Sequence, residues 1–184
     1  AARAAAALGV VRGDWNGFNI LHTAAGRVGA LDVCALPGEG GKGTRGILAA
    51  AKKGDLDVLF LGGADEIKTN ELATTFVVYM GTHGDAGAHR ADVILPAAAY
   101  TEKSVTYVNT EGRAQMTTRA HFPPGEAKED WAILRALSEA LGVTQSWNSL
   151  EELRQAMYAT APHLAALDQL FPAGLEQQRD VEQS

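Results

Sequence analysis

Three short runs of consecutive apolar residues, separated by glycine turns and short helical segments, constrain the fold most strongly. They occupy residues 58–61, 76–80 and 93–95. A strand with one face in water alternates apolar and polar residues, whereas a continuously apolar strand is typical of a sheet covered on both faces. We therefore predict an α/β fold with a doubly wound, mainly parallel sheet, flanking helices and right-handed crossovers.

Further elements are predicted from helix propensity, capping residues and apolar periodicity. The alanine-rich start has no capping residue before it, so we expect the chain to be a piece of a longer protein. We divide it into an α/β domain at 1–122 and a C-terminal helical segment at 123–184 that packs on it. The additional predicted elements are a helix at 1–8, a helix at 15–27 capped by Asp14, a strand at 31–36, a helix at 44–53 capped by Thr44 and ended by Gly54, a helix at 65–72, a hairpin at 105–118 with positive φ at Gly112, a helix at 128–141, a helix at 149–160 with a capping box from Ser149 to Glu152, and a polar, peripheral tail after Pro162.

Composition excludes several classes of protein. The net charge of -6 and the lack of a dense Lys/Arg run argue against a nucleic-acid partner. Cys34, the single cysteine, permits neither an internal disulfide nor a cysteine-ligated iron-sulphur cluster, and its apolar neighbours predict a small buried side chain. No apolar stretch approaches the roughly 20 residues of a membrane-spanning helix, so we expect no direct membrane insertion.

Candidate ligand-binding residues lie where the first two apolar runs end. The C-terminal edge of a parallel sheet is the usual ligand site in open α/β folds. The glycines equally serve tight turns, and the spacing of the histidines and carboxylates fits no zinc pattern, so we assign no catalytic and no metal-binding residue. We treat the set as the remnant of a sheet-edge cofactor site, with Asp92 nearby bracing a turn. The candidate residues are Gly62, Gly63, Asp65, Gly81, His83 and Asp85.

A glycine-rich loop at residues 38–43 lies between a predicted strand and a predicted helix, where backbone N–H groups can hold a phosphate. A phosphate-binding P-loop requires Gly-x-x-x-x-Gly-Lys-Ser/Thr, but here Lys42 is followed by Gly43. We interpret this segment as a surface loop and keep a nucleotide-binding module as an alternative. No serine lies in a nucleophile elbow, so nucleophilic catalysis is not expected.

Two segments carry a specific resemblance. The molybdopterin oxidoreductase superfamily has a segment similar to Ala91-Asp-Val-Ile-Leu-Pro-Ala-Ala-Ala-Tyr-Thr-Glu-Lys-Ser104 and Tyr107-Val-Asn-Thr-Glu-Gly-Arg-Ala-Gln115. Within this superfamily, residues 61–65, 81–88 and 123–139 resemble the C-terminal region of the large iron-sulphur subunit of proton-pumping NADH:quinone oxidoreductase, respiratory complex I. The resemblance covers roughly residues 15–142.

This resemblance implies a non-catalytic scaffold in the peripheral arm, which supports electron transfer from NADH to quinone. It places [2Fe-2S] and [4Fe-4S] clusters in an N-terminal part outside this sequence, and none here. The implied partners are other peripheral-arm subunits and the rest of the same chain. The implied location is the cytoplasmic face of a bacterial plasma membrane or the matrix face of the mitochondrial inner membrane. The alternative is a piece of a working molybdenum or tungsten pterin enzyme, such as a formate dehydrogenase, whose cofactor the loops near Gly62 and Gly81 would hold.

Overall fold

The computed structural model describes residues 1–12, 15–72, 74–84 and 86–169. The chain packs as two compact units. Unit 1 contains residues 1–36, 105–117 and those from 154 on, and unit 2 contains residues 37–104 and 118–153. The division at residue 122 that we expect from the sequence stays a prediction. Among the described residues, no helix has the length and apolar character needed to cross a membrane.

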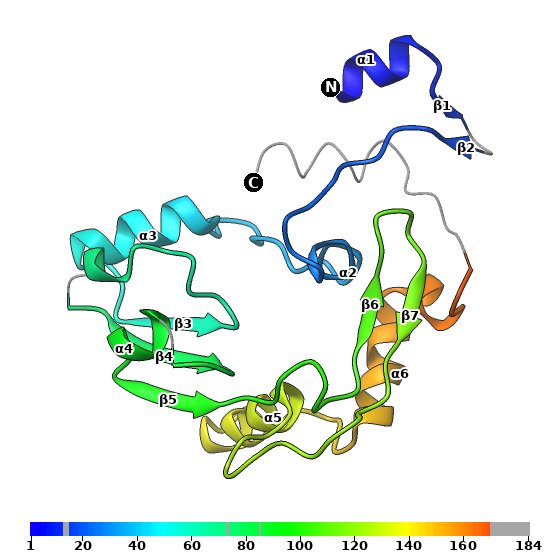
Figure 1. Cartoon of the computed structure of the whole chain (residues 1–184). Helices are drawn as coiled ribbons and strands as arrows, with labels where there is room; N and C mark the ends of the chain where they lie inside the picture. The colour runs from blue at the N-terminus through cyan, green and yellow to red at the C-terminus, as the bar shows by residue number, and fades with distance from the viewer. Residues whose placement is uncertain (13–14, 73, 85, 170–184) are drawn as a thin grey trace. The chain divides into compact units, whose positions relative to one another are not determined.

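Unit 2 is built on a parallel sheet of three strands, as predicted (Figure 1). In this sheet Val58 pairs with Phe76, and Val78 pairs with Val93. The order of the strands in the sheet is their order in the chain, so right-handed crossovers place both connections on the same face. The strands are β3 (Val58–Gly62), β4 (Phe76–Gly81) and β5 (Val93–Pro96).

One face of this sheet forms the core of unit 2. Leu59, Leu61, Val77 and Tyr79 alternate with residues of the other face and are almost inaccessible to solvent. They pack with buried or half-buried apolar residues from the helical segments before and between the strands. Those segments are α3 (Thr44–Lys53), the short helix η1 (Thr69–Glu71) and α4 (Ala86–Arg90).

The opposite face differs from the prediction that both faces are covered. Val58, Phe60 and Phe76 are between 45% and 50% exposed, and Val93 is 39% exposed. These side chains are apolar enough for a buried strand, which is why the sequence predicts burial. The segments α3, η1 and α4 pack on the other face, where Ile94 of the edge strand β5 is still 52% exposed.

The helices of unit 2 form where the sequence predicts them, with two differences. Gly54 ends α3 with φ of +79°, as predicted, but Gly43 precedes the helix and Thr44 is its first residue without a side-chain cap. The helix predicted at 65–72 is reduced to η1. The helix α5 (Asp130–Ala140) lies within its predicted range.

The capping box that begins α6 (Leu150–Thr160) is present in part. The Glu152 N–H donates to Ser149 Oγ at 3.1 Å, as the sequence predicts. The Glu152 carboxylate accepts instead from the Asn148 N–H at 2.5 Å, one residue earlier than in the standard box. Both bonds satisfy backbone donors at the start of the helix.

Unit 1 departs further from its prediction. The segment predicted as a helix at 15–27 begins as a short antiparallel pair with the preceding strand, and the Asn16 side chain accepts the Phe18 N–H at 2.9 Å. An Asn that bonds its own backbone in this way competes with helix formation. Asp14, its predicted cap, lies outside the described residues. The elements of unit 1 are α1 (Ala2–Ala7), β1 (Val11–Arg12), β2 (Trp15–Asn16), α2 (Arg27–Asp32), β6 (Thr106–Val108), β7 (Ala114–Met116) and the short helix η2 (Pro162–Ala165).

The strand predicted at 31–36 is wrong, because α2 occupies its first residues. A short apolar run does not by itself distinguish a strand from a helix. Cys34 follows the helix with φ of +57° and is exposed, so the prediction that it is buried is also wrong. The turn directs the Cys34 side chain to solvent, although its neighbours in the sequence are apolar.

The predicted hairpin is confirmed by the antiparallel strands β6 and β7, in which Val108 pairs with Ala114. Gly112 in its turn has φ of +85°. The hairpin packs against Ala161 and Leu164, and Leu164 is only 1% exposed. The prediction of a peripheral tail after Pro162 is therefore wrong at Leu164, and residues 170–184 lie outside the described part.

Gly112→Val is expected to lower the free energy of unfolding by about 2 kcal/mol, because a β-branched residue rarely adopts positive φ. Urea denaturation followed by circular dichroism measures the change. Gly112→Asn is the control, since Asn tolerates this backbone region, and it is expected to cost less. Equal stability of Gly112→Val and the parent sequence would refute the role assigned to this turn.

Candidate functional site

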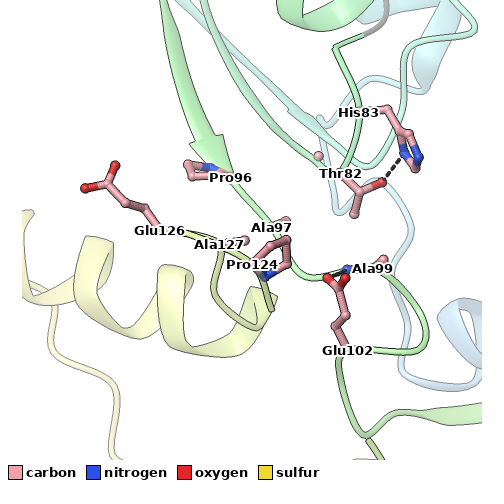
Figure 2. Close-up of a pocket in the computed structure, with 10 residues that line it drawn as sticks. Thr82, His83, Pro96, Ala97, Ala99, Glu102, Pro124, Glu126 and Ala127 are labelled. Atoms are coloured by element: carbon pink, nitrogen blue, oxygen red, sulfur yellow. Dashed lines mark hydrogen bonds between the residues drawn. The ribbon is translucent and has the colours of Figure 1, made fainter. Parts of the chain in front are cut away.

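A hollow in unit 2 lies at the C-terminal ends of β4 and β5 and has a volume of about 310 Å³ (Figure 2). This is the sheet edge at which the sequence predicts a remnant site. Its walls come from three segments of unit 2. They are the end of β4 with Gly81, Thr82 and His83, the end of β5 and the turn after it with Pro96, Ala97, Ala99 and Glu102, and the loop before α5 with Pro124, Glu126 and Ala127.

Backbone hydrogen bonds fix these walls. The Ala97 N–H donates to the Gly81 carbonyl at 2.9 Å and ties the segment after β5 to β4. Ala97 also forms an isolated parallel bridge with Lys128, in which the Ala98 N–H donates to the Lys128 carbonyl at 2.8 Å. The Lys128 N–H donates in turn to the Pro96 carbonyl at 3.1 Å. The loop before α5 is thereby attached to the edge of the sheet.

The polar side chains of the hollow are largely engaged within the protein. The Glu102 carboxylate accepts the Ala99 N–H at 2.9 Å, and Thr82 Oγ1 lies 2.7 Å from His83 Nδ1. Figure 2 shows the Glu126 side chain directed away from Thr82 and His83. In the described part of the chain, two carboxylates and no Lys or Arg line the hollow, so its lining does not suit a phosphate or diphosphate group.

Gly81 and Gly87 are explained by the ring of Tyr79. A Cβ atom at Gly81 would lie 2.3 Å from the Tyr79 Cζ and Oη atoms, and one at Gly87 would lie 2.7 Å from the ring carbons. These two glycines therefore allow β4 and α4 to pack closely on a buried tyrosine. The space that glycine leaves open at this edge is filled by the protein's own side chain.

Of the five predicted site residues that the structure describes, Gly81 and His83 line the hollow. Gly63 has φ of +61° and donates its N–H to the Met80 carbonyl at 2.7 Å, which serves the turn after β3. Gly62 is the last residue of β3. Asp65 is not part of the lining, and its Cβ lies 3.0 Å from where a Cβ at Gly87 would be. Asp85 lies outside the described residues.

Sequence reasoning missed Glu102 and the loop before α5. The available signal for Glu102 was its position seven residues after the apolar run of β5, close enough to return to the sheet edge. The bridge to Lys128 depends on a contact distant in sequence, which no local pattern reveals. Among the described residues, no group of three or more His, Cys, Asp or Glu side chains is placed to hold a metal ion.

The glycine loop that precedes α3 also has a local explanation. The Gly41 N–H donates to the Gly38 carbonyl at 2.8 Å, and Gly40 has φ of +73°. A Cβ at Gly41 would lie 2.9 Å from the Gly38 oxygen. The glycines thus close a tight turn, and this favours a surface loop over the nucleotide-binding alternative.

Asp92 and Arg90 tie β4 to the start of β5. The Val77 N–H donates to the Asp92 carboxylate at 2.8 Å, and Arg90 donates to the same carboxylate at 3.2 Å and to the Thr75 carbonyl at 2.7 Å. The bond from Val77 holds the pKa of Asp92 below its ordinary value of 3.8; desolvation opposes this effect and Arg90 adds to it. Asp92 thus braces this junction, as the sequence suggests.

Other polar residues of the two segments that carry the resemblance also serve the backbone. Asn109 Oδ1 accepts the N–H groups of Glu111 at 3.0 Å and of Arg113 at 2.9 Å across the hairpin turn. The Arg113 guanidinium donates to the Asp168 carbonyl. Lys103 forms a close ion pair with Asp130 at the start of α5. These contacts are structural ones.

Asp92→Asn tests the bracing role through pH. A carboxyl whose pKa is depressed by folding contributes stability that is present above its unfolded pKa, near 3.8, and is lost as the pH falls through the folded pKa. The variant is therefore expected to be less stable than the parent sequence at pH 7, and the difference should shrink below about pH 4. Urea denaturation at several pH values measures it. A difference that does not change with pH would contradict the assignment.

The comparisons with known proteins agree with the resemblance seen in the sequence. The family model described as molybdopterin oxidoreductase matches residues 1–140. The chain belongs to the molybdopterin oxidoreductase family. Its relatives in this family include the "NADH-ubiquinone oxidoreductase 75 kDa subunit" of Reclinomonas americana, 48% identical over 151 residues, which are 82% of this chain and 21% of the relative.

A second relative in the molybdopterin oxidoreductase family is the "NADH-ubiquinone oxidoreductase 78 kDa subunit, mitochondrial" of Candida albicans, 46% identical over 89% of this chain and 21% of the relative. The chain thus spans about a fifth of the length of these curated relatives. Among solved structures, acetylene hydratase from Pelobacter acetylenicus matches 53% of this chain and 15% of its own with a TM-score of 0.47 and 21% identity.

The family description implies a molybdopterin group, and the described residues do not fit one. Among the described residues, the lining of the hollow at the sheet edge includes Glu102 and Glu126 but no Lys or Arg, and the room beside Gly81 is filled by the Tyr79 ring. A pterin cofactor carries phosphate, whose negative charge needs cationic side chains or free backbone N–H groups. This part of the chain offers it no evident binding site.

Proposed function

We propose that this chain is a segment of the large iron-sulphur subunit of an NADH:quinone oxidoreductase, and that it acts as a scaffold in the peripheral arm of respiratory complex I. The observation that carries the proposal is the 48% identity, over 82% of the chain, to a 75 kDa subunit of this name. The segment supports electron transfer from NADH to quinone without taking part in the chemistry.

The geometry of the sheet edge supports a scaffold over a pterin-dependent enzyme. A catalytic member would need groups at this edge that hold an anionic cofactor. Here Tyr79 fills the space at Gly81 and Gly87, and the nearby carboxylates disfavour phosphate. The polar residues Asp92 and Asn109 are engaged with backbone groups. Of the predicted sheet-edge residues, Gly63 accordingly serves a turn and Gly81 close packing.

The remaining parts of the proposal concern the complete protein. Iron-sulphur clusters of the [2Fe-2S] and [4Fe-4S] types lie in its N-terminal part, because this segment has only Cys34 as a possible thiolate ligand. Its partners are other subunits of the peripheral arm and the rest of its own chain. The protein is attached to the membrane through these partners, on the cytoplasmic face in a bacterium or the matrix face in a mitochondrion.

Purification of the full-length parent protein through an affinity tag tests this proposal. We expect NADH:quinone oxidoreductase activity and the other subunits of the complex to copurify with it. Glu102→Gln is expected to leave the activity per assembled complex within about twofold of the parent, because a scaffold contributes nothing to the transition state. Formate oxidation by the purified protein, or a large loss of activity in Glu102→Gln, would contradict the proposal.

A further inference from the structure

Asn16, the last residue of β2, differs from the other asparagines of the chain in the residue that follows it. Asn16 precedes Gly17, whereas the other four asparagines precede Ile20, Glu71, Thr110 and Ser149. Its side-chain Oδ1 also accepts the Phe18 N–H at 2.9 Å. The side chain of Asn16 is therefore already in contact with the backbone that follows it.

An asparagine followed by glycine can react with its own backbone. The nitrogen of the next residue attacks the side-chain amide carbon, and a five-membered succinimide ring forms as ammonia is expelled. Water then opens the ring at either of its two carbonyl groups, which gives aspartate or isoaspartate. Glycine favours the attack because it has no Cβ to obstruct ring closure and leaves the backbone free to rotate. The overall change consumes water, releases ammonia and involves no oxidant or reductant.

The hydrogen bond from Phe18 favours this reaction at Asn16. It closes a short ring that contains the Gly17 nitrogen, so the side-chain amide carbon is folded toward the atom that attacks it. When the nitrogen adds to this carbon, negative charge develops on Oδ1, and the Phe18 N–H already donates to that oxygen. The bond therefore orients the reacting groups and stabilises the intermediate.

A second hydrogen bond opposes the reaction. The Gly17 N–H donates to the Val10 carbonyl at 2.7 Å, and this proton has to leave the nitrogen for the ring to form. The bond extends the short antiparallel pair of β1 and β2, which no third strand joins in the described part of the chain. A two-stranded pair of this kind is marginally stable in water, so it opens locally at a low cost in free energy.

We propose that Asn16 and Gly17 form a site of spontaneous modification, at which Asn16 cyclises in the folded protein and becomes aspartate or isoaspartate. Each product carries a negative charge in place of a neutral amide. Isoaspartate also inserts a methylene group into the backbone of β2, which disrupts the register in which Val11 pairs with Asn16. The inference concerns the chemistry of this chain and goes beyond the proposed function, on which it does not rest.

Peptide mapping of the full-length parent protein by mass spectrometry tests the proposal. The protein is incubated at mildly alkaline pH, either folded or in urea, and electron-transfer fragmentation distinguishes isoaspartate from aspartate. Asn109 is the matched control, because its Oδ1 accepts the Glu111 N–H at 3.0 Å in the same way, but a threonine follows it. We expect Asn16 in the folded protein to be modified at least about tenfold faster than Asn109, and within about tenfold of its own rate in urea.

Gly17→Ala tests whether the Gly17 nitrogen is the attacking group. The added methyl group hinders ring closure, so we expect the modification of Asn16 to slow at least about fivefold. An equal rate in this variant would overturn the proposal. So would modification of folded Asn16 no faster than that of Asn109, or fast modification only in urea, since the fold would then protect the site. These last two comparisons use the parent sequence and decide the question even if Gly17→Ala does not fold.

Discussion

Gly87→Leu is expected to lower the free energy of unfolding by about 3 kcal/mol, the upper end of the usual cost of overpacking a core. A Cβ at Gly87 would lie 2.7 Å from two ring carbons of Tyr79 and 3.0 Å from the Asp65 Cβ. Tyr79 is 4% exposed and has the rest of the core behind it, so its ring cannot move aside without cost. Urea denaturation followed by circular dichroism measures the loss.

Gly84→Leu is the matched control, three residues before Gly87 in the segment between β4 and α4. A Cβ at Gly84 meets nothing within 4 Å, so this substitution is expected to change the stability by less than about 0.5 kcal/mol. Similar stability of the two variants would show that Tyr79 does not occupy the space beside Gly87. The space at this sheet edge would then be open and not filled by the Tyr79 ring.

Leu164→Ala is the second large effect, an expected loss of about 3 kcal/mol. Leu164 is 1% exposed and packs with Val108, Ala114 and Ala161, so its removal leaves a cavity behind the hairpin. Leu21→Ala is the control in unit 1, because Leu21 is 84% exposed and its truncation should cost little. If the two substitutions lowered the stability equally, Leu164 would not be a buried core residue. The segment after Pro162 would then be peripheral, as the sequence predicts.

The sequence predicts the sheet of unit 2 well because its strands are fixed by local composition. Continuous apolar runs and a stop glycine such as Gly54 each determine a conformation within a few residues. Unit 1 is predicted less well because its elements depend on distant contacts. Residues 31–36 have the apolar content of a strand, but α2 occupies the first of them. A Cβ at Gly29 of this helix would lie only 3.3 Å from Val108 Cγ2, so the glycine allows close packing on the distant hairpin.

The site is predicted only in its location. The strand ends point to the sheet edge, and the structure places Gly81 and His83 at the hollow there. A binding role for these residues stays a prediction. The chemistry of the hollow depends on Glu102 and on the bridge between Ala97 and Lys128. This bridge joins segments about 30 residues apart. Glycine in a sequence does not reveal whether the space it leaves holds a ligand or, as at Gly81, a tyrosine ring. That distinction requires three-dimensional packing.

Metal analysis of the full-length parent protein tests the central claim most directly. Iron, molybdenum and tungsten are measured by mass spectrometry on the purified protein and expressed per polypeptide. The scaffold account predicts iron from clusters elsewhere in the subunit without molybdenum or tungsten, because the sheet edge around Tyr79 and Glu102 does not suit the phosphate of a pterin cofactor. Stoichiometric molybdenum or tungsten would contradict it and make this segment part of a working pterin enzyme.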